Sequence, residues 1–443
     1  MTVSAVPDWA RHVMWWQIYP LGFCGAPIQP VGDAERVLTH RLPRVEHWLD
    51  HLIDLGLNGL QLGPVFASDT HGYDTVDHFR IDPRLGDDAD FDRLVDAAHR
   101  RGIRVLLDGV FNHVGRSHPA VQRAAAGGPT SAEAGLFRID WTGWRPDAPV
   151  AAATFEGHDA LVALDHTARD VEDLVVEVML HWLNRGADGW RLDAAYAVPP
   201  AFWAAVLPRV RKRYPDAWFS GEVIHGDYPS IVRESTMDSV TQYELWQGIW
   251  HSIADRNFFE LKHAIERHDA LLATFPPSTF IGNHDVTRIA SAIGVEFVPH
   301  AVAVLMSVAG VPSIYAGDEY ATAGLKEHRF GGDDAVRPEF PDAPPRHLSD
   351  EAEAVLSAHR ELIRLRRRHP WLHRAHTDVV AVTNETIVLR TASDQAALVV
   401  ALNLADDEAR TPAAGAAHVL AGDGRLDRAD VTLPGRGWAV LAG

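Results

Sequence analysis

The chain has 443 residues, of which 47% are hydrophobic and 23% are charged, the composition of a globular protein larger than one ordinary domain. The 41 basic and 60 acidic residues give a formal net charge of −19, which argues against the clustered basic charge that a nucleic-acid partner needs. No segment approaches the ~18 uninterrupted apolar residues that span a bilayer, so we expect no membrane partner either.

The first part of the chain alternates between strands and helices. Apolar runs predict strands over residues 13–20, 57–64 and 103–110, and amphipathic patterns predict helices over 42–56 and 88–102. This alternation is typical of a parallel sheet covered by helices.

The alternation is interrupted once and then resumes. Residues 114–165 contain no clear helix–strand pair and exceed the length of an ordinary connection, so we expect a small excursion domain there. Further helices are predicted over 171–186, 199–215 and 349–370, and further strands over 189–194, 216–223, 239–244, 279–285 and 311–319.

The count of eight strands with intervening helices predicts an α/β fold, a (β/α)₈ TIM barrel. After Pro370 the pattern changes to short β-like runs separated by turns, which predicts an antiparallel β domain. The predicted division is a barrel formed by residues 1–112 and 166–372, an excursion domain at 113–165 and a C-terminal β-sandwich domain at 373–443.

Four of the predicted strands end in carboxylates, namely Asp108, Asp193, Glu222 and Asp285. Because an apolar strand interior does not accept an unpaired charge, these groups are expected at the carboxyl edge of the sheet, where barrel active sites lie. Any one of them alone is explained as a helix cap, but the whole ordered series is not.

Two carboxylates can cleave a glycosidic bond when one attacks the anomeric carbon and the other protonates the departing oxygen. The attacking group must be ionised and the acid must hold its proton, so the two need different surroundings. Arg191 lies two residues before Asp193, on the same strand face, and can keep that carboxylate ionised.

These segments together resemble the conserved regions of the α-amylase family of retaining α-glycoside hydrolases and transglycosidases. The matching segments are HGYDTVDHFRIDPRLG (71–86), DGVFNH (108–113), GWRLDAA (189–195), GEVIH (221–225), IGNHD (281–285) and GVPSIYAGDE (310–319). The resemblance covers roughly residues 13–370, and the tail fits the family's C-terminal β domain.

The resemblance implies a role for each matching position. Asp193 falls on the nucleophile, Glu222 on the general acid/base and Asp285 on the third acid, which binds sugar hydroxyls. The implied substrate-binding residues are Tyr73, which forms an aromatic platform, Asp74, His113, Arg191, His284 and Arg337, with Asp108 in support.

Asn112 matches a family asparagine that often binds calcium and that relatives without calcium keep as a hydrogen-bonding group. We expect no cofactor to be required, with calcium at Asn112 as the open alternative. No spacing typical of another metal site occurs among the 25 histidines.

The residues near the predicted catalytic acids suggest a substrate class. Tyr196 and Ala197 replace the Lys-His pair usual in secreted endo-amylases, while GWRLD and His225 resemble the cyclomaltodextrinase/neopullulanase group. The segment VALDH (162–166) matches neither the PKLN-like nor the PDLN sequence of relatives. The N-terminal β domain typical of that group, and the dimerisation it supports, are expected to be missing.

The expected activity is therefore hydrolysis of α-1,4 bonds, and as an alternative also α-1,6 bonds, in short or cyclic α-glucan oligosaccharides. The rival hypotheses are a transglycosidase or isomerase of the same family and, more remotely, a non-catalytic carbohydrate-binding relative. The single cysteine, Cys24, and the absence of a secretion-type N-terminus predict a cytoplasmic protein. A monomer or weak oligomer is expected.

Overall fold

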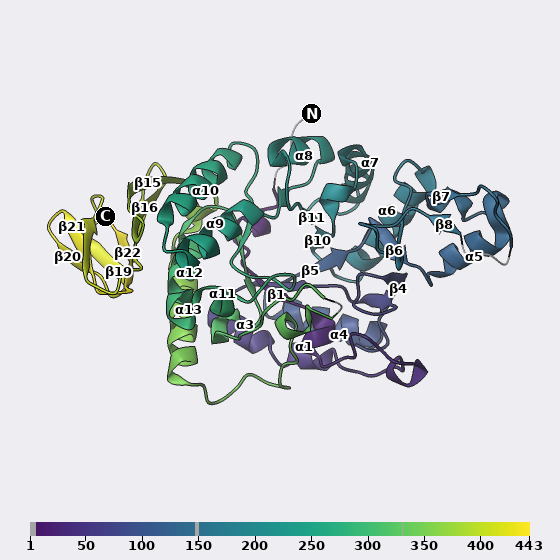
Figure 1. The fold of residues 1–443 in the computed structure, drawn as a ribbon, viewed down its shortest axis with the longest axis horizontal. Helices are drawn as coiled ribbons and strands as arrows, with labels where there is room; N and C mark the ends of the chain where they lie inside the picture. The colour runs from purple at the N-terminus through teal and green to yellow at the C-terminus, as the bar shows by residue number, and fades with distance from the viewer. Residues whose placement is uncertain (1–5, 147–149, 330) are drawn as a thin grey trace.

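A computed structural model describes residues 6–146, 150–329 and 331–443. Figure 1 shows three regions side by side: a central barrel, a projection formed by residues near 113–165 on one flank, and the C-terminal strands on the other. The barrel carries the predicted carboxylates, and the two flanking regions lie on opposite sides of it. The domain boundaries proposed from the sequence stay predictions.

Eight strands form the central sheet in the order β12-β11-β10-β5-β2-β1-β14-β13. Every pairing between them is parallel, and a single parallel bridge from Thr241 to Ser278 joins the two ends. The predicted (β/α)₈ fold is confirmed. The strands are β1 (Trp15–Ile18), β2 (Gly59–Leu62), β5 (Arg104–Gly109), β10 (Gly189–Leu192), β11 (Trp218–Gly221), β12 (Ser239–Val240), β13 (Ser278–Phe280) and β14 (Val311–Tyr315).

Helices cover the outside of this sheet (Figure 1). The main ones are α4 (Asp88–Arg100), α6 (Arg169–Asn184), α7 (Pro200–Arg211), α8 (Tyr228–Ser235), α9 (Tyr243–Ala254), α10 (Phe258–Leu271), α12 (Val298–Ser307) and α13 (Asp350–Arg368). Helix α4 begins with a capping box in which Asp87 and Asp90 each accept a hydrogen bond from the other's backbone N–H. Within the described residues, no helix is both long and apolar enough to cross a membrane.

One predicted helix is divided in the structure. Residues 42–56 form α2 (Pro43–Glu46) and α3 (Leu49–Leu55) instead of a continuous helix. The break falls at Trp48, whose ring stacks on that of Trp16 at 5.9 Å and whose indole N–H donates to the carbonyl of Pro341. Tertiary packing of this large ring overrides the helical periodicity of the segment.

The excursion segment has more regular structure than expected. It contains the helix α5 (Pro119–Gly127) and two small antiparallel ladders, β6 (His113–Gly115) with β9 (Leu161–Ala163) and β7 (Ile139–Asp140) with β8 (Ala151–Ala152). The β6–β9 ladder places both ends of the segment beside the barrel mouth, since β6 begins at His113.

The C-terminal region is antiparallel, as predicted. One sheet has the order β15-β16-β17-β22-β19 and a second has the order β18-β21-β20. The strands are β15 (His376–Val382), β16 (Thr386–Ala392), β17 (Ala397–Asn403), β18 (Ala409–Pro412), β19 (His418–Gly422), β20 (Arg425–Asp427), β21 (Asp430–Leu433) and β22 (Trp438–Ala442).

A buried ion pair holds the segment that leads to Tyr73. The Arg84 guanidinium donates to both carboxylate oxygens of Asp82, at 2.8 and 2.6 Å, and also to the carbonyls of Pro27 and Thr70. Its side chain is almost completely buried. Removing one partner of such a pair leaves the other charge buried and unpaired.

The substitution Arg84→Leu is expected to lower the free energy of unfolding by about 3–5 kcal/mol, because it leaves Asp82 buried without its cation. Urea denaturation of the wild type and the variant measures this change. Arg80→Leu, at an exposed position of the same segment, serves as the control and should change stability by less than about 0.5 kcal/mol. Equal losses in the two variants would contradict the role given to the ion pair.

Candidate active site

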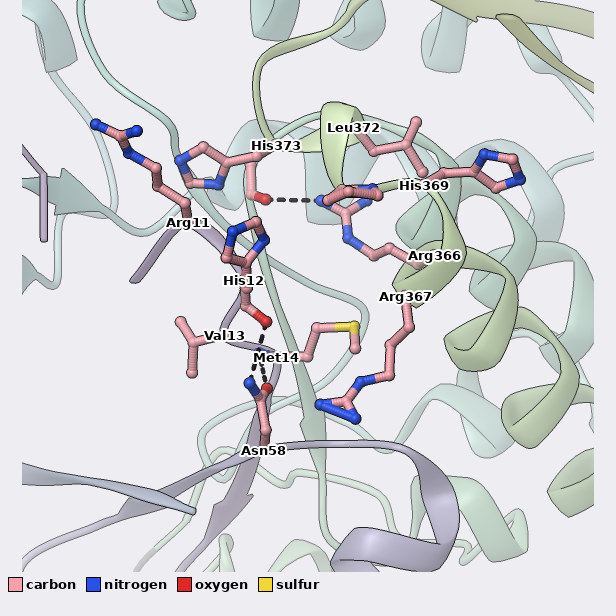
Figure 2. A pocket seen from close by; sticks show the side chains of 12 residues that line it. Arg11, His12, Val13, Met14, Asn58, Arg366, Arg367, His369, Leu372 and His373 are labelled. Atoms are coloured by element: carbon pink, nitrogen blue, oxygen red, sulfur yellow. Dashed lines mark hydrogen bonds between the residues drawn. The ribbon is translucent and has the colours of Figure 1, made fainter. Parts of the chain in front are cut away.

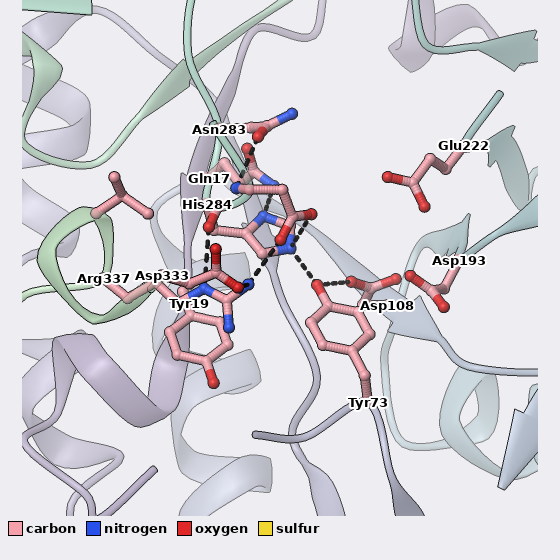
Figure 3. A network of polar contacts seen from close by, with 12 residues as sticks. Gln17, Tyr19, Tyr73, Asp108, Asp193, Glu222, Asn283, His284, Asp333 and Arg337 are labelled. Atoms are coloured by element: carbon pink, nitrogen blue, oxygen red, sulfur yellow. Dashed lines mark hydrogen bonds and ion pairs between the residues drawn. The ribbon is translucent and has the colours of Figure 1, made fainter. Parts of the chain in front are cut away.

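The predicted site residues come from the carboxyl ends of neighbouring barrel strands. Asp108 lies in β5 and is paired in register with Arg191 in β10. Asp193 is the first residue after β10, and Glu222 is the first after β11. Figure 3 shows Asp193 and Glu222 projecting towards the same space as Tyr73 and Asp108. The structure thus brings the strand-end carboxylates together at one mouth of the barrel.

Arg191 is the cation at the centre of this group. One guanidinium nitrogen lies 2.6 Å from Asp108 and 3.2 Å from Asp193, and the other lies 2.7 Å from Glu222. The side chain is buried, and burial opposes its charge, but the surrounding carboxylates, Asp108 and Glu222 foremost, raise its pKa well above the ordinary value. One positive charge therefore faces three acidic groups.

The Asp193 carboxyl is only 6% exposed. Burial, reinforced by the nearby Glu222 and opposed by Arg191, raises its pKa well above that of an ordinary aspartate. The Asp193 carboxyl therefore keeps its proton to a higher pH than an ordinary aspartate does.

Glu222 is held by donors on several sides. Its Oε2 accepts the backbone N–H of Ala194 at 2.9 Å, and its Oε1 accepts the hydroxyl of Tyr243 at 3.3 Å. Ala194 adopts a positive φ of 45° directly after Asp193, and this turn aims its N–H at Glu222. Asn283 in turn donates to the Tyr243 hydroxyl at 3.0 Å. The backbone N–H of Ala194 and the hydroxyl of Tyr243, itself held by Asn283, thus fix the orientation of the Glu222 carboxyl group.

Asp285 has a different electrostatic environment. Burial raises its pKa, but this is outweighed by the neighbouring His284 and Arg337, which hold the pKa well below the ordinary value. Arg337 Nη2 lies 2.6 Å from Asp285, and His284 Nε2 lies 3.0 Å from it. The Asp285 side chain is 31% exposed, so an ionised carboxylate faces the mouth of the barrel.

His284 lies between two aromatic rings. Its imidazole is parallel to Tyr73, with centroids 5.6 Å apart, and to Tyr19, with centroids 5.9 Å apart. The Tyr73 hydroxyl contacts His284 and donates to Asp108 at 3.2 Å, as Figure 3 shows. Gln17, from β1, contacts the other imidazole nitrogen at 3.1 Å. The contacts with Gln17, Tyr19 and Tyr73 fix the orientation of the His284 imidazole.

His113 lies at the root of the excursion segment. Its Nε2 donates to the carbonyl of Tyr73 at 2.9 Å, and its ring stacks on Phe155 with centroids 4.8 Å apart. Burial lowers its pKa to about 4, so it is neutral at physiological pH. Since Nε2 carries the proton, Nδ1 accepts the hydrogen bond from the amide of Asn112 at 3.1 Å.

Asp74 does not join the other carboxylates. Its two oxygens accept the backbone N–H and the hydroxyl of Thr70, and the residue is 3% exposed. Its position supports the loop that carries Tyr73.

Several residues of this site were not foreseen from the sequence. Tyr19, Gln17, Tyr243 and Asn283 each contact a predicted site residue. Gln17 had a usable signal, because it is the one polar residue in the apolar run VMWWQIYP. Tyr243 had none, because the sequence pattern placed it inside the predicted strand 239–244, whereas it is the first residue of α9.

The excursion segment reaches the same mouth. Glu156 accepts a hydrogen bond of 2.8 Å from the hydroxyl of Tyr196. The Tyr196 ring also lies beside Phe155, at 6.5 Å, and beside His225, at 5.4 Å. Tyr196, which the sequence marked as a departure from related enzymes, therefore contacts both the excursion segment and His225.

Asn112 is the residue at which the sequence left calcium open. Calcium prefers several oxygen ligands, commonly carboxylates. The Asn112 amide nitrogen donates to His113, which leaves the amide oxygen as the one side-chain atom that could face a cation. Within the described ranges, the group of His, Cys, Asp or Glu side chains close enough to share a metal is His40, Asp87 and Asp90, which does not include a neighbour of Asn112, so calcium at Asn112 stays a prediction.

Comparison with known proteins extends this result. The chain matches the model "Alpha amylase, catalytic domain" over residues 17–422. It is 31% identical over 433 residues to neopullulanase 2 of Thermoactinomyces vulgaris, covering 89% of this chain and 69% of that protein. It is 28% identical over 391 residues to a maltogenic α-amylase of Bacillus acidopullulyticus, covering 84% and 65%. The chain thus spans about two thirds of the length of these relatives.

Solved structures cover the whole chain. The cyclic α-maltosyl-(1→6)-maltose hydrolase of Arthrobacter globiformis, in complex with that sugar, has a TM-score of 0.83 and 26% identity, and the match covers 99% of this chain and 100% of that one. The debranching enzyme of Nostoc punctiforme has a TM-score of 0.83 and 25% identity, with 100% of each chain covered. With the family model matching most of its length, the chain belongs to the α-amylase family.

Proposed function

We propose that this protein is a retaining α-glucoside hydrolase that cleaves α-1,4 bonds, and also α-1,6 bonds, in short or cyclic maltooligosaccharides. The observation that carries the proposal is the convergence of Asp193, Glu222 and Asp285 around Arg191 and His284 at one barrel mouth. The names of the relatives, a neopullulanase, a maltogenic amylase and a cyclic maltosyl-maltose hydrolase, support this class of substrate.

In the proposed reaction, Asp193 attacks the anomeric carbon while Glu222 gives its proton to the departing glycosidic oxygen. A covalent glycosyl–Asp193 ester forms and the first product leaves. Glu222, now ionised, takes a proton from water, and the resulting hydroxide adds to the anomeric carbon and releases Asp193. The first step requires Glu222 to be protonated and Asp193 to be ionised.

The remaining residues bind the sugar and stabilise charge in this proposal. Asp285, kept ionised by Arg337 and His284, accepts hydrogen bonds from sugar hydroxyls. Tyr73 presents a ring face to the C–H face of the sugar. Arg191 stabilises the Asp193 carboxylate, and His113 supports the platform through the Tyr73 carbonyl. Arg337 is assigned to orienting Asp285, and Asp74 to holding the Tyr73 loop.

The substrate class is tested by product analysis with maltotriose, a cyclodextrin, pullulan and sucrose. Net hydrolysis of the first three is expected, and proton NMR should find the α-anomer first, because two inversions give retention. Only larger or rearranged sugars, without net hydrolysis, would favour the transglycosidase or isomerase. A β-anomer as the first product would refute the double displacement.

Separate variants distinguish the nucleophile from the acid. Asp193→Asn should lower kcat on maltotriose by at least about 10⁴-fold with the circular dichroism spectrum unchanged. Glu222→Gln should be similarly impaired on maltotriose but should release a burst of nitrophenol from a nitrophenyl α-maltoside, because nitrophenolate leaves without a proton. Asp96→Asn, at an exposed position on α4, is the control. A burst from Asp193→Asn, or none from Glu222→Gln, would contradict the assignment.

The pH dependence of kcat/KM should be bell-shaped, because the first step needs Asp193 ionised and Glu222 protonated. Activity requires ionised Asp193, whose pKa is raised by burial. The acid limb should therefore begin at a higher pH than the ~3.9 of an ordinary aspartate, with activity lost as the pH falls through the raised pKa. An acid limb at or below the ordinary value would exclude this electrostatic arrangement.

The hydrogen bond between Tyr196 and Glu156 is expected to hold the excursion segment over the substrate. Tyr196→Phe should raise KM for maltotriose about three- to tenfold, the value of one such bond, while kcat changes less. Tyr214→Phe, which removes a 3.3 Å bond to Asn184 on the barrel surface, is the matched control. A selective fall in kcat would instead place Tyr196 in the chemistry.

A further inference from the structure

A cavity lies at the opposite end of the barrel from the strand-end carboxylates. It has a volume of about 390 Å³ and is lined by the residues that precede three adjacent strands, namely Val13 and Met14 before β1, Asn58 before β2 and Gly310 before β14. The end of α13 and the turn after it complete the wall (Figure 2). The amide of Asn58 donates to the His12 carbonyl and its oxygen accepts from Met14 N–H, which ties two of these segments together.

The wall is strongly basic. Its lining includes three arginines and three histidines and no acidic residue: Arg11, Arg366, Arg367, His12, His369 and His373. The whole chain carries a formal charge of −19, so this concentration of basic side chains runs against the overall balance. Figure 2 shows Arg11, His12 and His373 on one side and Arg366 and Arg367 on the other.

Arg366 is buried without a carboxylate partner among the described residues. Its guanidinium donates to the carbonyls of Met306, Val308 and Gly310, at 3.0, 2.7 and 2.7 Å. These carbonyls orient the group but do not neutralise it, and burial lowers its pKa to about 10. The guanidinium is still charged at neutral pH and contributes a fixed positive charge to the cavity wall.

His373 provides an independent sign of a missing partner. The residue is 8% exposed, and across the part of the chain that the structure describes its Nε2 atom has no hydrogen-bonding partner. Buried polar atoms are rarely left in this state. Burial foremost, and then the charge of Arg366, lower the pKa of His373 to about 3, so its imidazole is neutral at physiological pH.

The position of these arginines at a helix end explains only part of the cluster. Arg366 and Arg367 lie in the last turn of α13, where cations are favoured by the helix dipole. Arg11 and His12 come from a segment more than 350 residues earlier in the chain, and a helix dipole gives no reason for them. Arg11 pairs with Asp8 at 3.5 Å, but the Asp8 side chain is 96% exposed, so this pair neutralises little of its charge.

We propose that this cavity binds a phosphate group, either inorganic phosphate or the phosphate of a small sugar monoester. Arginine side chains match the geometry of phosphate oxygens, and several donors from different segments suit a dianion. The exposed Arg11 and Arg367 would close on the phosphate, and His373 Nε2 would donate to it. The cavity is far too small for a nucleic acid, which the net charge also disfavours. The proposal does not depend on the sugar chemistry at the other end of the barrel.

Isothermal titration calorimetry with the full chain tests the proposal, using inorganic phosphate, glucose 6-phosphate and glucose as probes. Saturable binding of at least one phosphate probe is expected in ~150 mM sodium chloride, with none for glucose. Tighter binding of glucose 6-phosphate would identify a monoester site, and tighter binding of inorganic phosphate would identify a site for the free ion. The double variant Arg11→Gln/Arg367→Gln should weaken binding by at least about tenfold, because it removes two charge-assisted contacts at exposed positions.

Arg364→Gln is the matched control, since it removes one charge from an exposed position of α13 that does not line the cavity. This variant should leave the affinities for inorganic phosphate and for glucose 6-phosphate unchanged. His373→Gln, which replaces the unpartnered imidazole with an amide, should weaken phosphate binding without changing hydrolysis of maltotriose. No saturable binding by the wild-type protein, or an equal loss in Arg364→Gln, would overturn the proposal.

Discussion

The contact of one guanidinium with three carboxyl groups is the constraint around which the barrel mouth is organised. Arg191 reaches Asp108, Asp193 and Glu222 from the middle of β10, and it can do so only because β5, β10 and β11 are adjacent and parallel. The three carboxyl groups outnumber the one guanidinium, and burial raises the pKa of Asp108 and of Asp193. In the proposed reaction, two of these carboxyl groups serve as the nucleophile and the acid.

Asp285 has different electrostatic surroundings from this group. Arg337 and His284 hold its pKa low, while burial and Glu222 hold that of Asp193 high. Two aspartates at one barrel mouth thus have opposite pKa shifts, and the difference comes from their neighbours. His284 is in turn fixed by Gln17, Tyr19 and Tyr73, which come from the start of the chain. The electrostatics of the site therefore depend on closure of the barrel, which brings β1 and β13 to the same side through β14.

The two ends of the barrel have contrasting charge. The carboxyl ends of the strands carry acids around a few buried cations, whereas the amino ends carry arginines and histidines with no acid lining the cavity. Parallel strands make such a division simple, because all their amino ends meet on one side. The basic cavity and the acidic mouth are therefore built from opposite ends of the same strands, β1, β2 and β14 among them.

The sequence by itself determined the fold class, the family and the order of the strand-end carboxylates, because these depend on local apolar periodicity and on short motifs that keep their spacing. It also marked Tyr196 as a departure from relatives and His225 as a match to the cyclomaltodextrinase/neopullulanase group. Tertiary structure alone decided the division of residues 42–56 at Trp48, the contacts of Tyr243 with Glu222, the meeting of Tyr196 with Glu156, and the withdrawal of Asp74 to Thr70. These contacts depend on the folded backbone, because local sequence carries no record of a partner 21 or more residues away, nor of the turn that directs the Asp74 carboxylate to Thr70, four residues earlier.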